Sequence, residues 1–315
     1  MAWTRRSVSE PIRIAIIGLG KIARDAHAPA ISANPAFDLV ATVDPAGGFD
    51  EYPAFRSADD FFDSGIAVDA VSICTPPAVR SQIASRCLMH GLAVMLEKPP
   101  AVSTVQAAEL EELARNSGVG LLAAWHSRFA PGYVPACDAT AGHRIICGKV
   151  TWREDVRQWH PGQDWIFADS GFGVFDPAIN ALSFLLGIDP TISVDQAKLF
   201  VPRGREMPIR AQAGLRSESG GRIDCDFDFL WPGNPEWTIE LKTTAGAITL
   251  ESGGHRLLID GRSVELPKAG EYVVLYQRFA QIVHESSVDC DVAPLRIVEN
   301  CLSFGERFSA PSFSF

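Results

Sequence analysis

The chain has 315 residues, of which 47% are hydrophobic and 21% are charged, so it is long enough for two domains with sizeable cores. The net charge is −10 and there is no basic run, which argues against negatively charged partners such as nucleic acid and anionic membranes. No apolar stretch approaches the roughly 20 residues of a membrane span, and residues 1–11 lack the apolar region of a secretory signal, so we interpret them as a flexible tail.

The first pattern in the chain lies between residues 12 and 44. Residues 12–17 form a short apolar run, and the sequence Gly-Leu-Gly-Lys-Ile-Ala at 18–23 follows directly. A second apolar run at residues 38–43 ends in Asp44. This order of strand, glycine turn, helix, strand and acid is that of a dinucleotide-binding βαβ unit, although a glycine turn also occurs in ordinary α/β proteins. The helix between the runs is predicted to pack through one face made of Ile22, Ala26, Ala30 and Ala33.

The small residues of this turn each have a predicted role. Gly18 permits a tight turn after the strand, and Gly20 lets the backbone approach a pyrophosphate because no Cβ is in the way. Ala23 lets the helix pack close to the strand. The phosphate would then contact free N–H groups at the start of the helix.

Asp44 indicates which dinucleotide is preferred. A carboxylate at the end of the second strand accepts hydrogen bonds from a ribose diol and repels a 2′-phosphate. Residues 45–48 (Pro-Ala-Gly-Gly) contain no Arg or Lys that could neutralise such a phosphate. The sequence therefore favours NAD over NADP, although NADP stays possible and an Asp before Pro can also cap a turn.

Strands and helices alternate as far as residue 128. Strands are predicted at 68–74, 92–96 and 119–124, with helices at 58–62, 78–90 and about 104–116; Ser103 and Gln106 form a capping-box pattern. This alternation predicts an α/β N-terminal Rossmann domain, a doubly wound parallel sheet spanning residues 12–128. In such a sheet, ligands bind at the carboxyl ends of the strands. Those ends carry Gly18, Gly20, Asp44, Thr75, Lys98 and His126.

The pattern changes in residues 129–315. A short helix is predicted at 132–139, a strand at 144–155 and a helix from Asp176 to Leu186. Residues 191–264 form a meander of strands with turn signals, and two helices at about 272–285 and 294–309 close the chain. We expect an α+β C-terminal domain with a largely antiparallel open sheet. Its last helices could pack back on the first domain.

The cysteines and histidines give no sign of a disulfide frame or a metal. The number of cysteines is odd, no CxxC occurs, and the histidines lack ligand spacing. We expect buried free thiols, a cytoplasmic protein and no metal. The cysteines are Cys74, Cys87, Cys137, Cys147, Cys225, Cys290 and Cys301.

The segment Glu97-Lys98-Pro99-Pro100 carries the first candidate for catalysis. The prolines restrict the backbone around Lys98, and a lysine at a strand end of this sheet would point toward a bound nicotinamide. The ring of oxidised NAD is cationic, and a nearby cation lowers the pKa of an ammonium group. A lysine placed there can be a general base at neutral pH, whereas the alternative is a solvated surface lysine.

The second candidate constellation spans residues 152–180. Asp176 and Asn180 are four residues apart and share a helix face, although Asp followed by Pro is also a standard helix start. Asn180 is polar on a face that otherwise is apolar. Upstream aromatic and polar side chains are of the kind that bind a sugar, although His160 could also be an ordinary loop histidine. These upstream residues are Glu154, Trp159, His160 and Trp165.

These motifs resemble a known family. GLGKIA near the start, CTPP, EKPP and the pattern Asp-x-x-x-Asn resemble the glucose–fructose oxidoreductase/inositol dehydrogenase (Gfo/Idh/MocA) family over residues 12–310. The segments WHSRFAPG, WREDVRQWHPGQDWIF and GVFDPAINALS resemble its D-galactose 1-dehydrogenase/L-arabinose 1-dehydrogenase branch. The resemblance implies NAD(P)-dependent oxidation of an unphosphorylated aldose at C1 to the aldonolactone.

The resemblance also assigns roles to residues. Lys98 matches the catalytic lysine and Asp176 the acid of the family, while Asn180 stands where a histidine is common. Because Asn cannot act as acid or base, the proton role shifts to Lys98, alone or with Asp176. The catalytic set is therefore Lys98, Asp176 and Asn180, and the substrate-binding set is Glu154, His160, Trp159, His126 and Trp237.

The remaining expectations concern cofactor and partners. The predicted cofactor contacts are Gly18, Leu19, Gly20, Lys21, Ile22, Asp44, Thr75, Pro76, Pro77, Glu97, Lys98, Trp125, His126, Arg128 and Trp165. The resemblance implies that residues 129–315 bind substrate and form the dimer, so the expected partners are a small sugar and a second copy of the chain in a sheet-to-sheet homodimer. Three alternatives stay open: an inositol or other sugar oxidoreductase, a phosphosugar enzyme that uses Arg153 and Arg157, and a non-enzymatic NAD-bound sugar sensor.

Overall fold

The computed structural model describes residues 10–315, so most of the predicted tail lies outside the described residues. The chain divides into two compact units. The first comprises the residues up to Ala124 together with Tyr272–Asp291, and the second comprises Trp125–Glu271 and Val292–Phe315. In this division the first unit ends four residues before the boundary predicted at Arg128, and it also contains residues 272–291.

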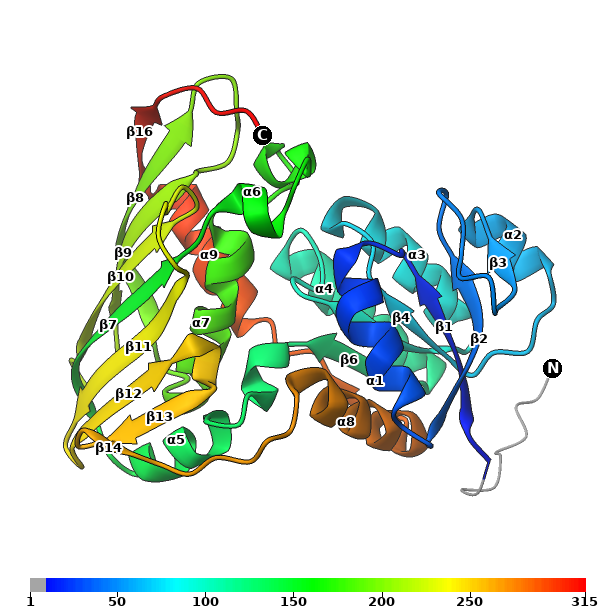
Figure 1. Cartoon of the computed structure of the whole chain (residues 1–315), viewed down its shortest axis with the longest axis horizontal. Helices are drawn as coiled ribbons and strands as arrows, with labels where there is room; N and C mark the ends of the chain where they lie inside the picture. The colour runs from blue at the N-terminus through cyan, green and yellow to red at the C-terminus, as the bar shows by residue number, and fades with distance from the viewer. Residues whose placement is uncertain (1–9) are drawn as a thin grey trace. The chain divides into compact units, whose positions relative to one another are not determined.

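The first unit is built on a parallel sheet (Figure 1). Its seven strands follow the order β15-β6-β5-β4-β1-β2-β3, and each pairing in this order is parallel. The predicted doubly wound α/β sheet is confirmed. The strands are β1 (Ile12–Ile17), β2 (Phe37–Val43), β3 (Ala54–Phe55), β4 (Ala70–Ile73), β5 (Ala93–Glu97), β6 (Leu121–Ala124) and β15 (Val288–Asp289).

The helices of the first unit follow the predicted alternation, and an added one comes from the end of the chain. Phe37 of β2 packs against Tyr276 and Phe279 of α8, with ring centroids 5.4 and 5.9 Å apart. This aromatic contact explains why residues 272–291 belong with the first sheet. The α-helices are α1 (Ala28–Ser32), α2 (Ala58–Asp63), α3 (Pro77–Met89), α4 (Thr104–Ser117) and α8 (Glu271–Glu285).

The ends of α4 show how local sequence sets a helix. The Ser103 side chain accepts a hydrogen bond from the Gln106 N–H at 3.2 Å, and Gly118 ends the helix with a φ of 66°. Gly suits this left-handed position because it has no Cβ. The predicted capping box is only half formed, because the Gln106 side chain accepts instead from Ser81, at 2.9 Å.

The helix after the glycine turn packs through a face that matches the predicted one only at Ala30. Residues Ala23–His27 form a π-helix, and α1 continues it. A π turn contains more residues than an α turn, so the side chains beyond it rotate relative to the α-helical spacing. Ile22 is 39% exposed. The buried residues of this segment are Ala23, His27, Ala30 and Ile31.

The second unit is built on a larger sheet of nine strands, in the order β14-β13-β12-β11-β7-β10-β9-β8-β16. The pairings are antiparallel except β7 with β10 and β8 with β16, which are parallel. The predicted α+β domain is confirmed. The strands are β7 (Ile145–Arg153), β8 (Ser193–Pro202), β9 (Arg210–Arg216), β10 (Arg222–Asp228), β11 (Glu236–Thr243), β12 (Ala247–Glu251), β13 (Arg256–Ile259), β14 (Arg262–Ser263) and β16 (Glu306–Ala310).

The α-helices of this unit are α5 (Tyr133–Thr140), α6 (Val156–Trp159), α7 (Phe175–Ile188) and α9 (Ala293–Phe304). The prediction of a helix through residue 309 was wrong, because Gly305 turns to an extended conformation and β16 follows. A Cβ on Gly305 would lie 2.4 Å from the Cys301 carbonyl oxygen. Phe308 of β16 then stacks on Phe200 of β8, with ring centroids 5.4 Å apart.

The large sheet has one buried and one polar face. In β10, Ile223, Cys225 and Phe227 are buried while Asp224 is exposed, which identifies the aspartates as the outward set. This alternation is the one expected for a sheet with helices on one side. Exposed residues aligned on the outward face are Lys149, Gln212, Arg216, Asp224, Glu240 and Lys242.

The seven cysteines are free thiols, but they are not all buried as predicted. Cys147 is exposed on the outward face of β7, where it pairs with Arg222 and Lys242. A shift in the β7–β11 register between Cys147 and Ile145 explains why Ile145, two residues earlier, is buried instead. Burial raises the pKa of Cys87, Cys290 and Cys301 to about 12 in each case. These three thiols are therefore protonated at neutral pH and behave as apolar groups.

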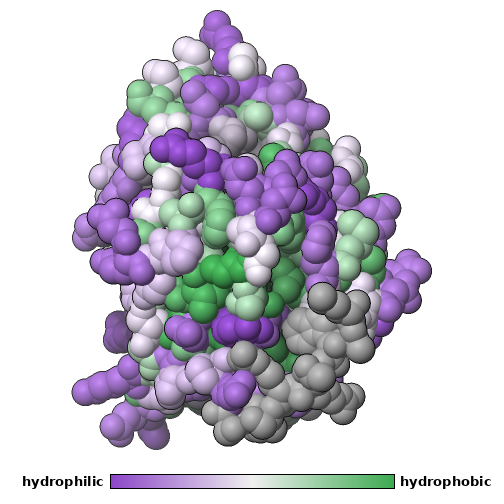
Figure 2. Space-filling model, turned by 90° about the vertical axis from the view of Figure 1, so that its right-hand side faces the viewer, coloured by the Kyte–Doolittle hydropathy of each residue, from purple (hydrophilic) through white to green (hydrophobic). Residues whose placement is uncertain are grey.

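Of the helices in residues 10–315, none is long and apolar enough to cross a membrane. On the face drawn in Figure 2, hydrophilic residues surround a smaller hydrophobic area. Exposed large hydrophobic side chains occur on several elements, including Met89, Val105, Val134 and Phe304.

Candidate active site

The glycine turn of the first unit has the conformation that its sequence predicts. Gly18 has a φ of +90°, and a Cβ there would lie 2.7 Å from the Thr75 backbone nitrogen, so only glycine fits. By contrast, no described atom lies within 4 Å of a Cβ built on Gly20. Packing therefore does not require glycine at position 20, which fits a position where a ligand approaches the backbone.

Asp44 contacts the glycine turn directly. Its Oδ2 accepts the Leu19 N–H at 2.7 Å, and its Oδ1 accepts the Ala46 N–H at 2.8 Å. Asp44 thus caps its own turn, as the alternative interpretation held, and the same bonds bring its carboxylate to the glycine turn. A carboxylate oxygen has further acceptor capacity, so turn capping and ribose binding are compatible.

Two arginines near this turn were not found by sequence reasoning. Arg24 Nε donates to the Leu19 carbonyl at 2.9 Å, and Arg56 donates to the Pro45 carbonyl at 3.3 Å. Arg56 lies 11 residues beyond Pro45, so the inspection of residues 45–48 could not reveal it. Thr75, which follows β4, has a buried hydroxyl without a hydrogen-bond partner among the described residues.

Three other predicted cofactor contacts lie near the glycine turn in the sequence or follow β4. Lys21 is exposed and pairs with Asp25 four residues later. Pro76 and Pro77 follow Thr75 and begin α3, where proline is favoured because it needs no N–H partner.

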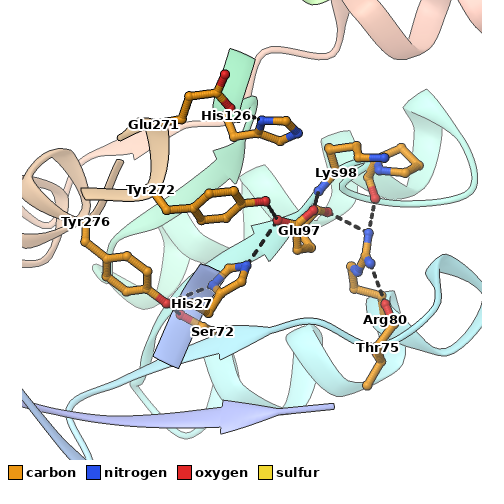
Figure 3. A network of polar contacts seen from close by, with 11 residues as sticks. His27, Ser72, Thr75, Arg80, Glu97, Lys98, His126, Glu271, Tyr272 and Tyr276 are labelled. Carbon is orange, nitrogen blue, oxygen red and sulfur yellow. Dashed lines mark hydrogen bonds and ion pairs between the residues drawn. The ribbon is translucent and has the colours of Figure 1, made fainter. Parts of the chain in front are cut away.

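Glu97 is the centre of a buried polar network at the end of β5 (Figure 3). The Glu97 side chain is only 3% exposed. Its Oε1 accepts from the Tyr272 hydroxyl at 2.5 Å and lies 3.1 Å from His27 Nε2, while its Oε2 accepts the Lys98 N–H at 2.8 Å. Lys98 itself is partly exposed, and its peptide bond to Pro99 is cis.

His27 extends this network into the core. Its Nδ1 lies 2.8 Å from the Tyr276 hydroxyl, which in turn lies 2.7 Å from Ser72 Oγ. Burial would lower the pKa of His27, but Cys74, Tyr276 and Glu97 outweigh burial and raise it well above the usual value. Glu97 Oε1 lies 3.1 Å from His27 Nε2, so a protonated His27 forms an ion pair with this carboxylate. The sequence analysis did not select His27. The only signal for it would have been its place on the buried face of the π-helix, which the α-helical spacing did not show.

In the second unit, Glu154 follows β7 and is buried at 4% exposure. Its Oε2 accepts a hydrogen bond from Trp237 Nε1 at 2.8 Å. Trp237 of β11 stacks on Trp152 and lies against Trp159, with ring centroids 5.9 and 5.3 Å apart. The indole N–H groups of Trp152 and Trp159 are buried without a partner among the described residues. The structure thus joins three predicted sugar contacts, Glu154, Trp159 and Trp237, in one cluster.

Asp176, His160 and Asn180 form a second group in this unit. Asp176 lies inside the first turn of α7 and makes no side-chain cap, because the N-cap position is Val174. Its carboxylate, in a residue 3% exposed, lies 3.5 Å from His160 Nε2, and His160 Nδ1 lies 3.4 Å from Gln163 Oε1. Asn180 is partly exposed, whereas its neighbours from Phe175 to Leu186 are buried. The helix-start explanation of Asp176 is therefore wrong, and its carboxylate contacts His160 instead.

The remaining predicted contacts lie in the second unit as well. His126 Nδ1 lies 2.5 Å from Glu271 Oε2, and His255 Nε2 lies 3.3 Å from Glu271 Oε1. Burial would raise the pKa of Glu271, but the two histidines lower it to about 2. Arg128 donates to the Ser183 carbonyl at 2.9 Å. Trp125 is buried at 3% exposure, and Trp165 is partly exposed.

The described residues offer groups for a dinucleotide and for a polyol, but not for a metal. Among residues 10–315, no cluster of three or more His, Cys, Asp or Glu side chains could hold a metal. The glycine turn, its bond to Asp44 and the parallel sheet have the features of a dinucleotide site. The acidic, aromatic and amide groups of the second unit are suited to neutral polyols. Together, the fold and these groups define the class of dinucleotide-dependent oxidoreductases.

Comparisons with known proteins agree with this class. The model of the Gfo/Idh/MocA oxidoreductase family, with its NAD-binding Rossmann fold, matches residues 12–124. A galactose 1-dehydrogenase from Pseudomonas fluorescens is 35% identical over 308 residues, which cover 96% of this chain and 99% of that protein. The chain therefore belongs to the Gfo/Idh/MocA oxidoreductase family, as the sequence resemblance predicted, and is a dehydrogenase.

Solved structures give the same result. The crystal structure of a D-galactose-1-dehydrogenase from Rhizobium etli matches with a TM-score of 0.91 at 41% identity, covering 98% of this chain and all of that one. A 3-ketoreductase from Actinomadura kijaniata in complex with NADP matches with a TM-score of 0.79 at 19% identity, covering 96% of this chain and all of that one. The second likeness shows the fold only.

Proposed function

We propose that the protein oxidises an unphosphorylated aldose of the D-galactose or L-arabinose type at C1, giving the aldonolactone. The observation that carries the proposal is the cluster of Glu154, Trp159 and Trp237. Its carboxylate, its ring faces and the Trp159 indole N–H, which has no partner among residues 10–315, suit a sugar. Similarity to two galactose 1-dehydrogenases over nearly the whole chain supports the same substrate class.

The proposed cofactor is NAD, held by the glycine turn with Asp44 on the adenosine ribose and the Thr75–Pro77 segment nearby in the fold. Asp44 supports NAD because a carboxylate repels a 2′-phosphate. Arg56, which bonds the carbonyl next to Asp44, is the group that could accept NADP as well. When bound, the oxidised nicotinamide supplies the acceptor for the C1 hydride.

The proposed proton acceptor is Lys98. Its amine takes the proton of the C1 hydroxyl, and Asp176 and Asn180 hold that hydroxyl by hydrogen bonds. Asn180 orients but cannot exchange a proton, whereas Asp176 is paired with His160 at 3.5 Å. Glu154 and His160 then select among the ring hydroxyls, with Trp159 and Trp237 as walls. His126, Arg128, Trp125 and Trp165 are assigned to the nicotinamide side of the site.

The phosphosugar alternative has less support. Arg153 pairs with Asp226 and with Glu236 at 3.3 Å, and it lies over the Trp231 ring. Arg157 lies 3.6 Å from Asp155 Oδ1 and over Phe313. A phosphate would have to compete with these carboxylates for both guanidinium groups.

The proposed assembly is a homodimer in the cytoplasm. The outward face of the large sheet carries lysines and carboxylates, which can pair across a two-fold axis. Free thiols fit a reducing compartment. A concentration-independent monomer mass in sedimentation would contradict the dimer.

The experiment that tests the function is a substrate panel. Unmodified aldoses, myo-inositol and sugar phosphates are each offered with NAD⁺ and with NADP⁺, and the nicotinamide absorbance is followed. We expect turnover with D-galactose or L-arabinose, a preference for NAD⁺ and a lactone product. Turnover only with inositol or with a phosphorylated sugar would support one of the alternatives, and binding without turnover would support a sensor.

A further inference from the structure

A buried guanidinium group contacts the segment that carries Lys98. Arg80 lies in the first turn of α3 and is only 3% exposed. Its Nη1 donates to the Glu97 carbonyl at 2.6 Å and also to the Pro99 carbonyl, while its Nη2 donates to the Thr75 carbonyl (Figure 3). A planar fork of donors can reach three carbonyls at once, which the single ammonium group of a lysine cannot do with the same geometry.

The contacts of Arg80 and Glu97 meet on one peptide group. The Glu97 carbonyl and the Lys98 N–H belong to the same peptide unit, which is planar. Arg80 donates to the carbonyl end at 2.6 Å, and the Glu97 carboxylate accepts from the N–H end at 2.8 Å. The peptide unit that precedes Lys98 is therefore held at both polar ends by buried charged side chains.

The carboxylate that holds the N–H end is itself fixed. Tyr272 donates to Glu97 Oε1 at 2.5 Å, and His27 Nε2 lies 3.1 Å from the same oxygen. Arg80 also bonds the carbonyl on the far side of Lys98, that of Pro99. Burying an arginine and a glutamate is costly unless each is well bonded, and proteins concentrate such costs at functional sites.

We propose that Arg80 and Glu97 are positioning residues for Lys98. They fix the backbone on both sides of the lysine, and so they set the direction in which its amine points. The inference rests on the proposed function, because it takes Lys98 as the proton acceptor.

The kinetic test compares two arginines of the same helix. Arg80→Met keeps the apolar stem and loses the fork, while Arg86→Met is the matched control, since Arg86 contacts Asp59 and the Phe62 ring. We expect Arg80→Met to lower kcat by ~10–100-fold, the size of effect that follows from misplacing a reacting group. The KM values for NAD⁺ and sugar should change by less than about threefold, because Arg80 is assigned to neither ligand.

Two milder variants test whether kcat depends on the contacts that hold the backbone of Lys98. Arg80→Lys should retain the charge but lower kcat by ~10-fold, between wild type and Arg80→Met. Tyr272→Phe removes one hydrogen bond to Glu97 and should lower kcat by ~3–10-fold. The kcat of Arg86→Met should equal that of wild type. Each assay is run well below the unfolding temperature of the variant, so that stability does not limit the rate.

A second measurement reports on Lys98 without any substrate. The chain has six lysines, so reductive methylation with ¹³C-formaldehyde gives a small set of NMR signals. The Lys98 signal is the one missing from Lys98→Met. We expect it to shift and broaden in Arg80→Met and in Glu97→Gln, and to stay unchanged in Arg86→Met.

The outcomes separate this proposal from the function on which it rests. A folded Arg80→Met protein with wild-type kcat and an unchanged Lys98 signal would overturn the positioning role. An increase in KM for NAD⁺ with intact kcat would overturn it too, by assigning Arg80 to the Thr75 segment. If Arg80→Met does not fold, Arg80→Lys and Tyr272→Phe are judged by the same criteria. A wild-type enzyme without sugar turnover refutes the function, and the NMR comparison then decides the role of Arg80.

Discussion

The two units hold their candidate functional side chains by different means. In the first unit, Lys98 follows β5 directly, and buried side chains bond the backbone on both sides of it. In the second unit, Glu154 and Trp237 come from segments 83 residues apart and are held by a side-chain hydrogen bond. A residue such as Lys98, which is placed by its own backbone segment, can be recognised from a contiguous sequence motif. A cluster such as Glu154 with Trp237 forms only when strand pairing brings distant segments together, so no contiguous motif reveals it.

The largest effect on turnover is expected from a substitution of Lys98. Lys98→Met keeps the length of the side chain and removes the amine, so turnover should fall by ~10²–10⁴-fold. NAD⁺ should bind about as well, since the glycine turn and Asp44 are unchanged. Wild-type turnover should rise with pH through one ionisation, and this limb should be lost in the variant. Steady-state rates across pH and a fluorescence titration with NAD⁺ provide the measurements.

A control for this variant lies on the other unit. Lys149 is exposed on β7, and Lys149→Met should retain the wild-type rate and pH profile. Unchanged turnover in Lys98→Met would move the proton acceptor to Asp176 or His160, and the fixed backbone of the first unit would then have no catalytic purpose.

Much of the first unit could be predicted because its signals are local. The GLGKIA turn, the strand alternation and the EKPP segment are each contiguous, and the structure has a strand or turn at each position. His27, Arg80 and Tyr272 were missed because a buried polar contact leaves no periodic signal. The predicted packed face after Gly20 was right at Ala30 but wrong at Ile22 and Ala33, since a π turn has no clear sequence signature.

The second unit was less predictable for the same physical reason. Its meander of strands was found from turn residues, but the aspartates on the outward face of β10 needed the observed register. Sequence spacing related Asp176 to Asn180, and the contact of Asp176 with His160 comes from the fold. Strand β16 was taken for the end of a helix because Glu306–Ala310 follows α9 after a single glycine.

The acid stability of the protein should depend on a charged contact of the second unit. The pKa of Glu271 is about 2, below its ordinary value of 4.5, because His126 and His255 outweigh burial. Its contribution is therefore present above about pH 4.5 and is lost as the pH falls toward 2. The full contribution is about 3 kcal/mol, of which about 2 kcal/mol should be lost between about pH 5 and about pH 3.

Urea unfolding of wild type and Glu271→Gln at these two pH values measures this term. The variant should be less stable at about pH 5 and should show a smaller decrease on acidification. Glu240→Gln, at an exposed position of β11, is the control and should follow wild type. Equal pH dependence in Glu271→Gln and wild type would mean that the histidine contacts do not stabilise the carboxylate.

A further prediction concerns the role of Asp44 in the choice between NAD⁺ and NADP⁺. Asp44→Ser combined with Pro45→Arg removes the repulsive carboxylate, keeps a side-chain acceptor for the Leu19 N–H and adds a cation. The ratio of kcat/KM for NADP⁺ over NAD⁺ should rise by ~10-fold, which corresponds to ~1.4 kcal/mol. Arg56→Ala is a second probe and should reduce any NADP⁺ activity of the wild type. A wild type that already prefers NADP⁺ would contradict the role given to Asp44.

The smallest expected effect is at Asn180, and it tests whether the second unit orients substrate without moving protons. Asn180→Ala removes one hydrogen bond to the sugar, which is worth roughly 0.5–1.5 kcal/mol and lowers kcat/KM by ~2–10-fold. Because an amide does not titrate, the pH profile should keep its wild-type shape while the rate falls. Asn116→Ala, at an exposed site of α4, should have no effect on either quantity. Asn180→His should restore sugar binding and add an ionisation to the profile, since a histidine titrates near pH 6.5. A loss in Asn180→Ala as large as that in Lys98→Met would show that the second unit shares the proton chemistry, and the division between a fixed base and an orienting cluster would no longer hold.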